Sequence, residues 1–225
     1  MKKYPFVATL FQLFFCLFVF FPATLAQKSF EFANILPVEA QPITSVAPQF
    51  FGNYESDKGK EFTYEFNDKG IFLKTINIQA ISQKTIRETG KYKVQNGYLF
   101  GVNEDSIPCF FEDSNYYFGV RNSIQLVGAD IANQLCLNSP TSYILNSKSE
   151  HGFVPMLLEF KNNQLIISSF DYDAEGTIFK KIKDQQQLVL ENNPLSIYLL
   201  QPTLKEWQKT AKKEIFRNPR VFIKQ

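Results

Sequence analysis

Apolar and polar side chains alternate along much of this chain, beginning near residue 50. Every second residue from Phe62 to Phe66 is aromatic and polar residues stand between them, a period of two that is typical of a half-buried β-strand. The segment 67–70 (NDKG) follows directly and predicts a tight turn in which Gly70 takes a positive φ. Asn96-Gly97 predicts a second hairpin turn. This pattern favours antiparallel β-structure.

The same alternation predicts short strands over most of residues 50–202. We expect them at 71–78, 85–94, 98–102, 107–111, 116–121, 124–127, 153–160, 164–172, 177–182, 187–190 and 196–200. Residues 129–137 are predicted to form one or two helical turns, and residues 138–152 a polar loop. The expected fold class is mainly β, an antiparallel up-and-down meander that closes into a barrel or a strongly curved sheet, with one C-terminal α-helix.

That helix has clear start and stop signals. Thr203 can cap its first turn, and Glu206 three residues later completes a capping box. Pro219 ends it soon after Arg217. The apolar stripe of the helix is Leu204, Trp207, Ala211 and Ile215. We expect residues 203–225 to form an amphipathic helix and tail packed on the domain, with contact to an anionic membrane surface as the alternative.

The first 26 residues have the three parts of an export signal. Lys2 and Lys3 give a positive start, residues 6–21 are uncharged and rich in Phe and Leu, and small residues precede a cleavage point between Ala26 and Gln27. An uncleaved anchor is the alternative, but the apolar run is near the lower limit for a spanning helix. The mature protein is therefore predicted to be secreted or periplasmic, with no stable membrane span.

Cleavage leaves a neutral chain. It removes Lys2 and Lys3, so that the 24 basic and 22 acidic residues become 22 of each. This balance argues against nucleic acid as a partner, because phosphate binding needs a basic surface. A mature length of about 200 residues suits one large β-domain. We divide it into an extended Pro-containing leader at 27–49, a β-barrel-like domain at 50–202 and the C-terminal segment.

Two cysteines remain after cleavage, Cys109 and Cys136. In an oxidising compartment an even pair predicts a disulfide. The bond would close a loop of roughly 28 residues and stabilise the fold by about 3 kcal/mol on the chain-entropy model. Two buried thiols are the alternative.

Several short segments resemble motifs of the lipocalin-like domains of exported bacterial proteins, which are calycin-type β-barrels. Gly52-Asn53-Tyr54 stands where the family has Gly-x-Trp, with Tyr54 in place of the Trp. Further matching segments are 64–70 (YEFNDKG), 89–94 (TGKYKV) and 176–181 (GTIFKK). The late helix with Trp207 is similar to the helix that packs on a lipocalin barrel. The resemblance implies an up-and-down barrel whose interior holds an apolar ligand, and it names no ligand.

Aromatic residues are concentrated between residues 98 and 118. The members of this belt are Tyr98, Phe100, Phe110, Phe111, Tyr116, Tyr117 and Phe118. Such side chains line ligand pockets or stack on sugars, although filling a β core is their commoner role. The candidates for a pocket lining are Tyr64, Phe66, Tyr92, Tyr98, Phe100 and Phe118.

A weak calcium candidate lies near the end of the β-domain. Asp171, Asp173 and Glu175 alternate ahead of Gly176, as oxygen ligands do at the start of a calcium loop. An EF-hand would need a Glu at the twelfth position, where Ile182 stands, so an acidic turn is the alternative.

Catalytic motifs are weaker still. His151 is the only histidine and lies in a polar segment, so any Ser-His-Asp or Cys-His mechanism would need it, and a zinc site of several histidines is excluded. Carboxylates that could act as a pair on a glycoside are Glu104, Asp105, Glu112 and Asp113, with solvated turns as the alternative. We predict no catalytic residue and no cofactor.

Three functions are compatible with these features. The first is an exported, non-enzymatic, lipocalin-like binding protein for a small apolar or amphipathic ligand. The second is a structural or protein-interaction module of the cell envelope with a filled barrel, and the third is a carboxylate-dependent hydrolase. A continuous dry cavity lined by aromatic residues would favour the first, whereas a solid interior with an exposed apolar patch would favour the second.

Overall fold

A computed structural model describes residues 28–56, 62–102, 106–170, 181–189, 196–211 and 215–225. Some residues singled out in the sequence lie outside this part of the chain. They are Ala26, Gln27, Glu104, Asp105, Asp171, Asp173 and Glu175.

The described residues form sixteen strands, two α-helices and one 3-10 helix. The strands of the N-terminal half are β1 (Lys28–Phe32), β2 (Pro42–Ile43), β3 (Gly52–Ser56), β4 (Phe62–Asn67), β5 (Gly70–Ser82), β6 (Lys93–Gln95), β7 (Tyr98–Phe100) and β8 (Ile107–Glu112). Those of the C-terminal half are β9 (Asn115–Val127), β10 (Gln134–Ser139), β11 (Ser142–Lys148), β12 (Phe153–Lys161), β13 (Gln164–Phe170), β14 (Gln185–Val189), β15 (Ser196–Leu200) and β16 (Phe216–Lys224). The helices are η1 (Pro48–Phe50), α2 (Gln83–Thr89) and α3 (Leu204–Ala211).

The strands join in one mainly antiparallel sheet, as the alternation predicts. Its order is β14-β15-β1-β12-β13-β16-β3-β4-β5-β9-β8-β7-β6, with β11, β10 and β2 branching from β12. Only the β1–β15 pair is parallel among the described pairs. The two ends of the path, β14 and β6, do not pair with each other. The sheet is therefore open and strongly curved, and the expected closure into a barrel is wrong for this structure.

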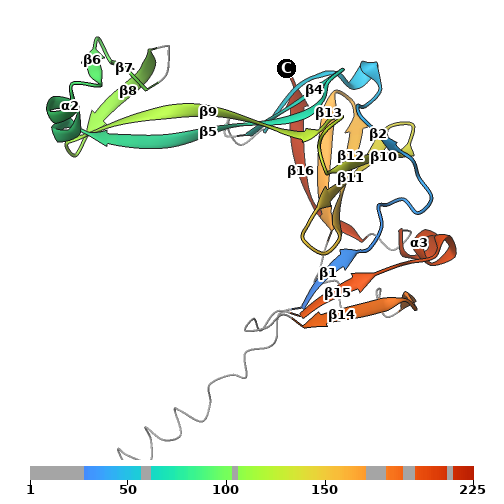
Figure 1. The fold of residues 1–225 in the computed structure, drawn as a ribbon. Coiled ribbons are helices and arrows are strands. Elements are labelled where there is room, and N and C mark those ends of the chain that lie inside the picture. Colours follow the sequence, from blue (N-terminus) through green and yellow to red (C-terminus); the bar gives the residue numbers. More distant parts are fainter. Residues whose placement is uncertain (1–27, 57–61, 103–105, 171–180, 190–195, 212–214) are drawn as a thin grey trace, which may run out of the picture.

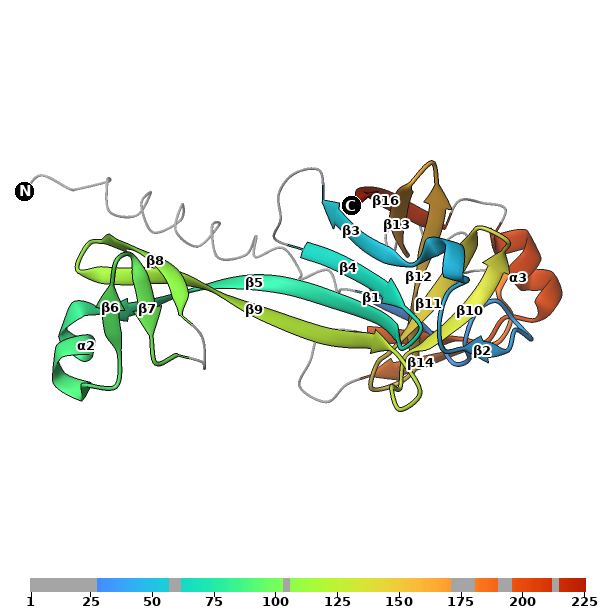
Figure 2. The ribbon, with the colours of Figure 1, turned by 90° about the horizontal axis from the view of Figure 1, so that it is seen from above.

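Two long strands give the molecule an elongated shape. β5 and β9 have 13 residues each and pair from Ile71–Val127 to Ser82–Asn115. Figures 1 and 2 show their far ends, together with α2, β6, β7 and β8, extending well beyond the remaining strands. We call residues 74–82 and 115–123 the arm, the group α2, β6, β7 and β8 at its far end the tip, and the remaining elements the body. At about 3.4 Å per residue, each strand is about 40 Å long.

The tip departs from the prediction at one element. Residues 85–94 were expected to form a strand, but residues 83–89 form the helix α2. The Ser82 hydroxyl accepts a hydrogen bond from the Thr85 backbone N–H, which caps the helix, and Gly90 ends it in the left-handed conformation. These end signals outweigh the β-branched residues between them. The predicted hairpin at Asn96-Gly97 is confirmed, with both residues at positive φ.

Residues 129–152 were predicted to form helical turns and a polar loop, and this is wrong. They contain β10 and β11, and β11 lies between β10 and β12 with residues 142–146 buried. The polar Asn146 is fully buried in this strand, where its amide bonds the backbone of Leu36. In the sequence, a polar residue such as Asn146 favours the prediction of a loop, although here it lies in a buried strand.

The C-terminal helix is confirmed, but it is shorter than predicted. Thr203 and Glu206 form the capping box, since each backbone N–H donates to the side chain of the other. After α3, residues 216–224 form a strand instead of the expected helix end and tail. Asn218 takes a positive φ next to Pro219, and the register with β13 shifts at this point. Such a bulge accommodates a proline, which cannot donate to the sheet.

The leader is part of the body. β1 pairs with β15 and touches β12, so the predicted extended backbone is present as a strand. Further along, the Leu36 N–H donates to Asn146 Oδ1 at 2.8 Å and the Leu36 carbonyl accepts from Asn146 Nδ2 at 2.7 Å. The Ala47 N–H donates to the Tyr143 hydroxyl at 3.0 Å. These bonds fix the leader against β11.

Two apolar clusters fill the body. In the first, the Phe160 ring stacks on Phe50 at 4.3 Å and meets the edges of Tyr54, Phe66 and Tyr143. The second cluster contains the buried Trp207 of α3, whose ring meets Phe32 edge-on. Trp207 thus packs α3 on the body, whereas Leu204 of the predicted stripe is exposed. No helix in the described part of the chain is long and apolar enough to cross a bilayer.

We predict that Asn146→Ala strongly destabilises the protein. It removes both bonds to Leu36 and leaves buried backbone groups without partners, so the free energy of unfolding should fall by about 2–4 kcal/mol. Asn122→Ala, at an exposed position of β9, is the control and should change it by no more than about 0.5 kcal/mol. Urea unfolding of the two variants measures the difference, and equal stabilities would contradict the role of Asn146.

Candidate functional site: the arm and its apolar strip

The six predicted pocket residues lie in two separate places. Phe66 is buried in the aromatic cluster of the body, and the half-buried Tyr64 meets the Phe222 ring edge-on at 5.0 Å. The other four belong to the tip and the adjoining end of β9. They are Tyr92, Tyr98, Phe100 and Phe118. The structure therefore does not bring the six together around one site.

The aromatic belt does gather at the far end of the arm, on both faces. Phe118 is buried there, and Leu99 in β7 is fully buried as well. Phe111 packs on Tyr116 with a ring separation of 4.7 Å, and Phe110 stacks on Tyr117 at 5.2 Å. The rings of Phe110 and Phe111, on opposite faces, are both partly open to solvent.

One face of the arm carries an unbroken row of apolar and small residues, which we call the apolar strip. Its members are Ile76, Ile78, Ala80, Pro108, Phe110, Tyr117 and Gly119. The strand register places Ile78 opposite Gly119, Ala80 opposite Tyr117, and Tyr117 opposite Phe110. A Cβ atom on Gly119 would lie 2.9 Å from Ile76 Cγ2, which confirms that these residues share a face.

The apolar strip is open to solvent. Ile76, Ile78 and Phe110 expose 40%, 67% and 57% of their surface. The alternate positions of β5, Thr75, Asn77 and Gln79, are polar and point to the other face. The arm is therefore amphipathic although its apolar face packs on no described element of the body.

Charged groups flank the strip at both ends. At the body end, Lys74 forms an ion pair with Glu65, and Lys74 and Asn67 hold the pKa of that carboxyl below its ordinary value. Arg121 lies opposite Ile76 and forms no ion pair within the described residues. At the tip end, Glu112 lies opposite Asn115 on the same face as Phe110.

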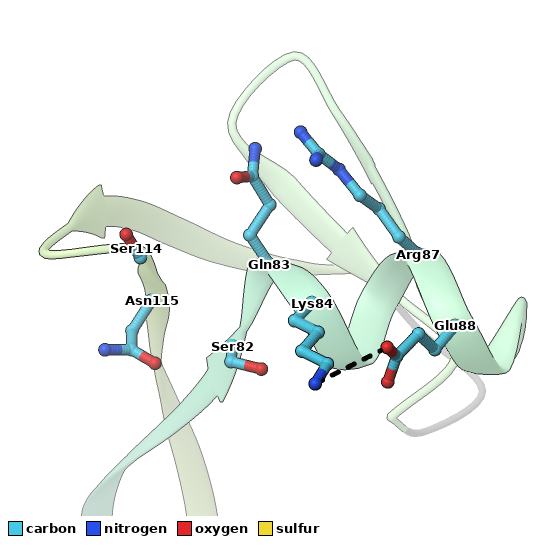
Figure 3. A pocket seen from close by; sticks show the side chains of 7 residues that line it. All are labelled: Ser82, Gln83, Lys84, Arg87, Glu88, Ser114 and Asn115. Carbon is cyan, nitrogen blue, oxygen red and sulfur yellow. Dashed lines mark ion pairs between the residues drawn. The ribbon is translucent and has the colours of Figure 1, made fainter.

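Two open hollows border the strip, and both are polar. A hollow of about 520 Å³ at the base of the arm is lined by Lys74, Arg121 and neighbouring polar residues of β3, β4 and β9. A second, of about 510 Å³, lies between α2 and the β8–β9 turn (Figure 3). In it Lys84 and Glu88 pair with each other at 3.7 Å, one turn apart on α2. Neither hollow is lined by the six predicted pocket residues.

Comparisons of the chain with protein-family models, with curated proteins and with solved structures found no match. The resemblance to lipocalin-like domains stays a prediction, and the site rests on geometry alone.

The predicted disulfide is absent from this structure. Cys109 and Cys136 are both free thiols. Cys109 pairs with Phe118 at the far end of β9, whereas Cys136 is buried in β10 of the body. The nine residues from Phe118 to the body end of β9 span about 30 Å, far beyond the reach of a disulfide. The disulfide was predicted from the number of cysteines and the oxidising compartment, and neither indicates how far apart the two thiols lie in the fold.

The candidates for metal or acid–base chemistry are dispersed. His151 Nε2 lies 3.9 Å from a Glu150 carboxylate oxygen. Glu112 and Asp113 lie at the β8–β9 turn, where Asp113 has a positive φ. Within the described residues, no group of three or more His, Cys, Asp or Glu side chains is placed to hold a metal ion.

We predict that the two thiols differ in reactivity. The half-buried Cys109 should react with a maleimide in the native protein, whereas the buried Cys136 should react only after unfolding. Burial raises the pKa of both thiols, so the native reaction should accelerate as the pH rises above the ordinary range of a cysteine. Mass spectrometry of the labelled protein counts the adducts.

Cys109→Ser and Cys136→Ser are the matched controls for this labelling. The first should remove the native adduct and the second only the adduct that appears on unfolding. A mature protein that shows no thiol in denaturant without reductant would contradict the assignment of free cysteines.

Proposed function

We propose that this chain is an exported, non-enzymatic protein-interaction module whose docking surface is the apolar strip of the arm. The observation that carries the proposal is the exposure of Ile76, Ile78 and Phe110 on one face of a projecting ribbon. Exposed apolar patches rimmed by polar residues are typical of interaction surfaces. Here Arg121 and Glu112 provide the polar rim.

The body supports this function better than the storage of a small ligand. Its rings pack directly on one another, with Phe50, Tyr54, Phe66 and Tyr143 all around Phe160. A ligand-holding interior would need these residues to line a cavity instead. A closely packed aromatic cluster in the body and an exposed apolar patch on the arm are the combination expected of the interaction module.

The arm itself also favours a partner. Between the body and the tip, residues 76–79 of β5 pair only with β9 among the described strands, and residues 119–122 of β9 pair only with β5. A two-stranded ribbon in water is marginally stable, because it cannot bury an apolar face. Burial of one exposed Ile or Phe side chain by a partner would contribute about 1.5–3 kcal/mol. Docking would thus stabilise both the complex and the arm.

We expect a photo-crosslinking amino acid at Phe110 to capture a protein in the native compartment. Gln79 is exposed on the opposite face of the arm and is the control position, where capture should be weak. Ile78→Asp should abolish capture at Phe110, because it places a charge in the centre of the strip. Gln79→Asp should leave that capture unchanged.

The proposal fails if Phe110 and Gln79 capture equally, or if Ile78→Asp has no effect on a folded protein. Circular dichroism and urea unfolding of each variant establish that the fold is retained. Either negative result would favour the alternative function, the binding of a small ligand inside the protein.

A further inference from the structure

We propose that the partner of the apolar strip is a second copy of this chain, with two arms packed face to face and antiparallel about a two-fold axis. This inference rests on the proposed function and names the occupant of its docking surface. Two properties of the strip support a second copy, namely its charge order and its pattern of large and small residues, and its size sets the strength of the association.

The charges of the strip change sign along the arm. Arg121 lies at the body end with no ion pair in the described part of the molecule, and Glu112 lies at the tip end. Antiparallel packing brings each Arg121 towards Glu112 of the other copy, so both ends are attractive. Parallel packing about a two-fold axis along the strands would bring together either the two Arg121 side chains in β9 or the two Glu112 side chains in β8, depending on which strand lies under the axis. Like charges in contact oppose association, so the order of charges selects the antiparallel arrangement.

The remaining charged groups near this face do not disturb that order. Lys74 is already paired with Glu65, and Lys84 with Glu88. Figure 3 shows the Arg87 side chain directed away from the Lys84–Glu88 pair. Arg87 lines the hollow at the tip end with Ser82 and Asn115. Arg121 and Glu112 are the charged groups of opposite sign that the strand register places on the face of the strip, one at each end.

The same register places large side chains on small ones. In this register, the cross-strand row that contains Arg121 faces the row that contains Glu112 of the other copy. Ile78 then faces Ala80 of the other copy, Tyr117 faces Gly119, and Phe110 faces Pro108. Gly119 has no side chain, and the Ile76 side chain leans over it, because a Cβ atom on Gly119 would lie only 2.9 Å from Ile76 Cγ2. Alternation of large and small residues across facing layers is what allows two sheets to interlock. The strip is thus complementary to itself in one register.

The size of the strip sets the strength of the association. Seven residues of β5 and the width of three strands give a face of about 25 Å by 14 Å, or about 350 Å² per copy. The total is below the roughly 1,000 Å² of a stable interface. The dimer should therefore be reversible and depend on concentration. The antiparallel arrangement also brings each tip towards the polar hollow at the base of the other arm.

The test is a charge exchange on the full mature chain, followed by sedimentation from about 1 µM to about 1 mM. Arg121→Glu and Glu112→Arg should each raise the dissociation constant at least about tenfold, because each places like charges together twice in the dimer. An equimolar mixture of these two variants should associate as the original protein does, because both contacts regain opposite charges. The chain that carries both substitutions should also self-associate normally.

Matched variants separate this arrangement from simpler explanations. Ile78→Asp should abolish the dimer, and Gln79→Asp on the other face should leave it intact. Lys161→Glu, an exposed charge change in the β12–β13 hairpin, should also have no effect. If the original protein is monomeric over the whole range, or if the mixture does not recover association, the antiparallel dimer is wrong. In that case, capture of a different protein at Phe110 would still support the proposed function, and its absence would overturn both.

Discussion

The insertion of the last strand into the middle of the sheet is the constraint on which the rest of the structure depends. β16 pairs with β13 on one side and with β3 on the other, so it connects the strands that carry the arm to the remainder of the body. Phe222 of β16 is buried in the main cluster and meets Tyr64 of β4 edge-on. Residues 222 and 223 of β16 are thereby paired on both edges inside the sheet, where an unpaired backbone group is costly. The arm is held by residues at the opposite end of the chain.

Local chemistry explains which elements were predictable. The turns at residues 67–70, 96–97 and 162–163 contain Gly or Asn at positive φ. The first and last join the strands expected around them, and the turn at 96–97 joins β7 to β6, a short strand at the end of the segment expected before it. The capping box of Thr203 and Glu206 likewise marks the start of α3. By contrast, β11 and β16 owe their conformation to distant partners. Asn146 is acceptable in a buried strand only because the leader supplies its hydrogen bonds, and no local pattern contains that information.

The apolar strip could be predicted only in part from the sequence, because its exposure also depends on distant strand pairing. The alternation of Ile76, Asn77 and Ile78 predicts a strand with one apolar face, and this is the face of the strip. Period-two alternation says that a face is apolar, but it does not say whether that face packs on the body or extends past it. The pairing of β5 with β9 decides this, because the paired strands run on beyond the end of β4. Cys109 is separated from Cys136 for the same reason.

The arm carries an apolar face away from the packed clusters of the body, so the two parts of the molecule differ in how their apolar groups are buried. Within the body, the aromatic rings pack on one another, and the Asn146 side chain finds its hydrogen-bond partners there. The apolar strip does not pack on the clusters of the body in the described chain, because β5 and β9 carry it away from them. A soluble protein rarely keeps such a face without a use, as it favours non-specific association. The ordered sequence of Arg121, aliphatic residues, rings and Glu112 restricts that association to one register, and so converts an aggregation hazard into a defined interface.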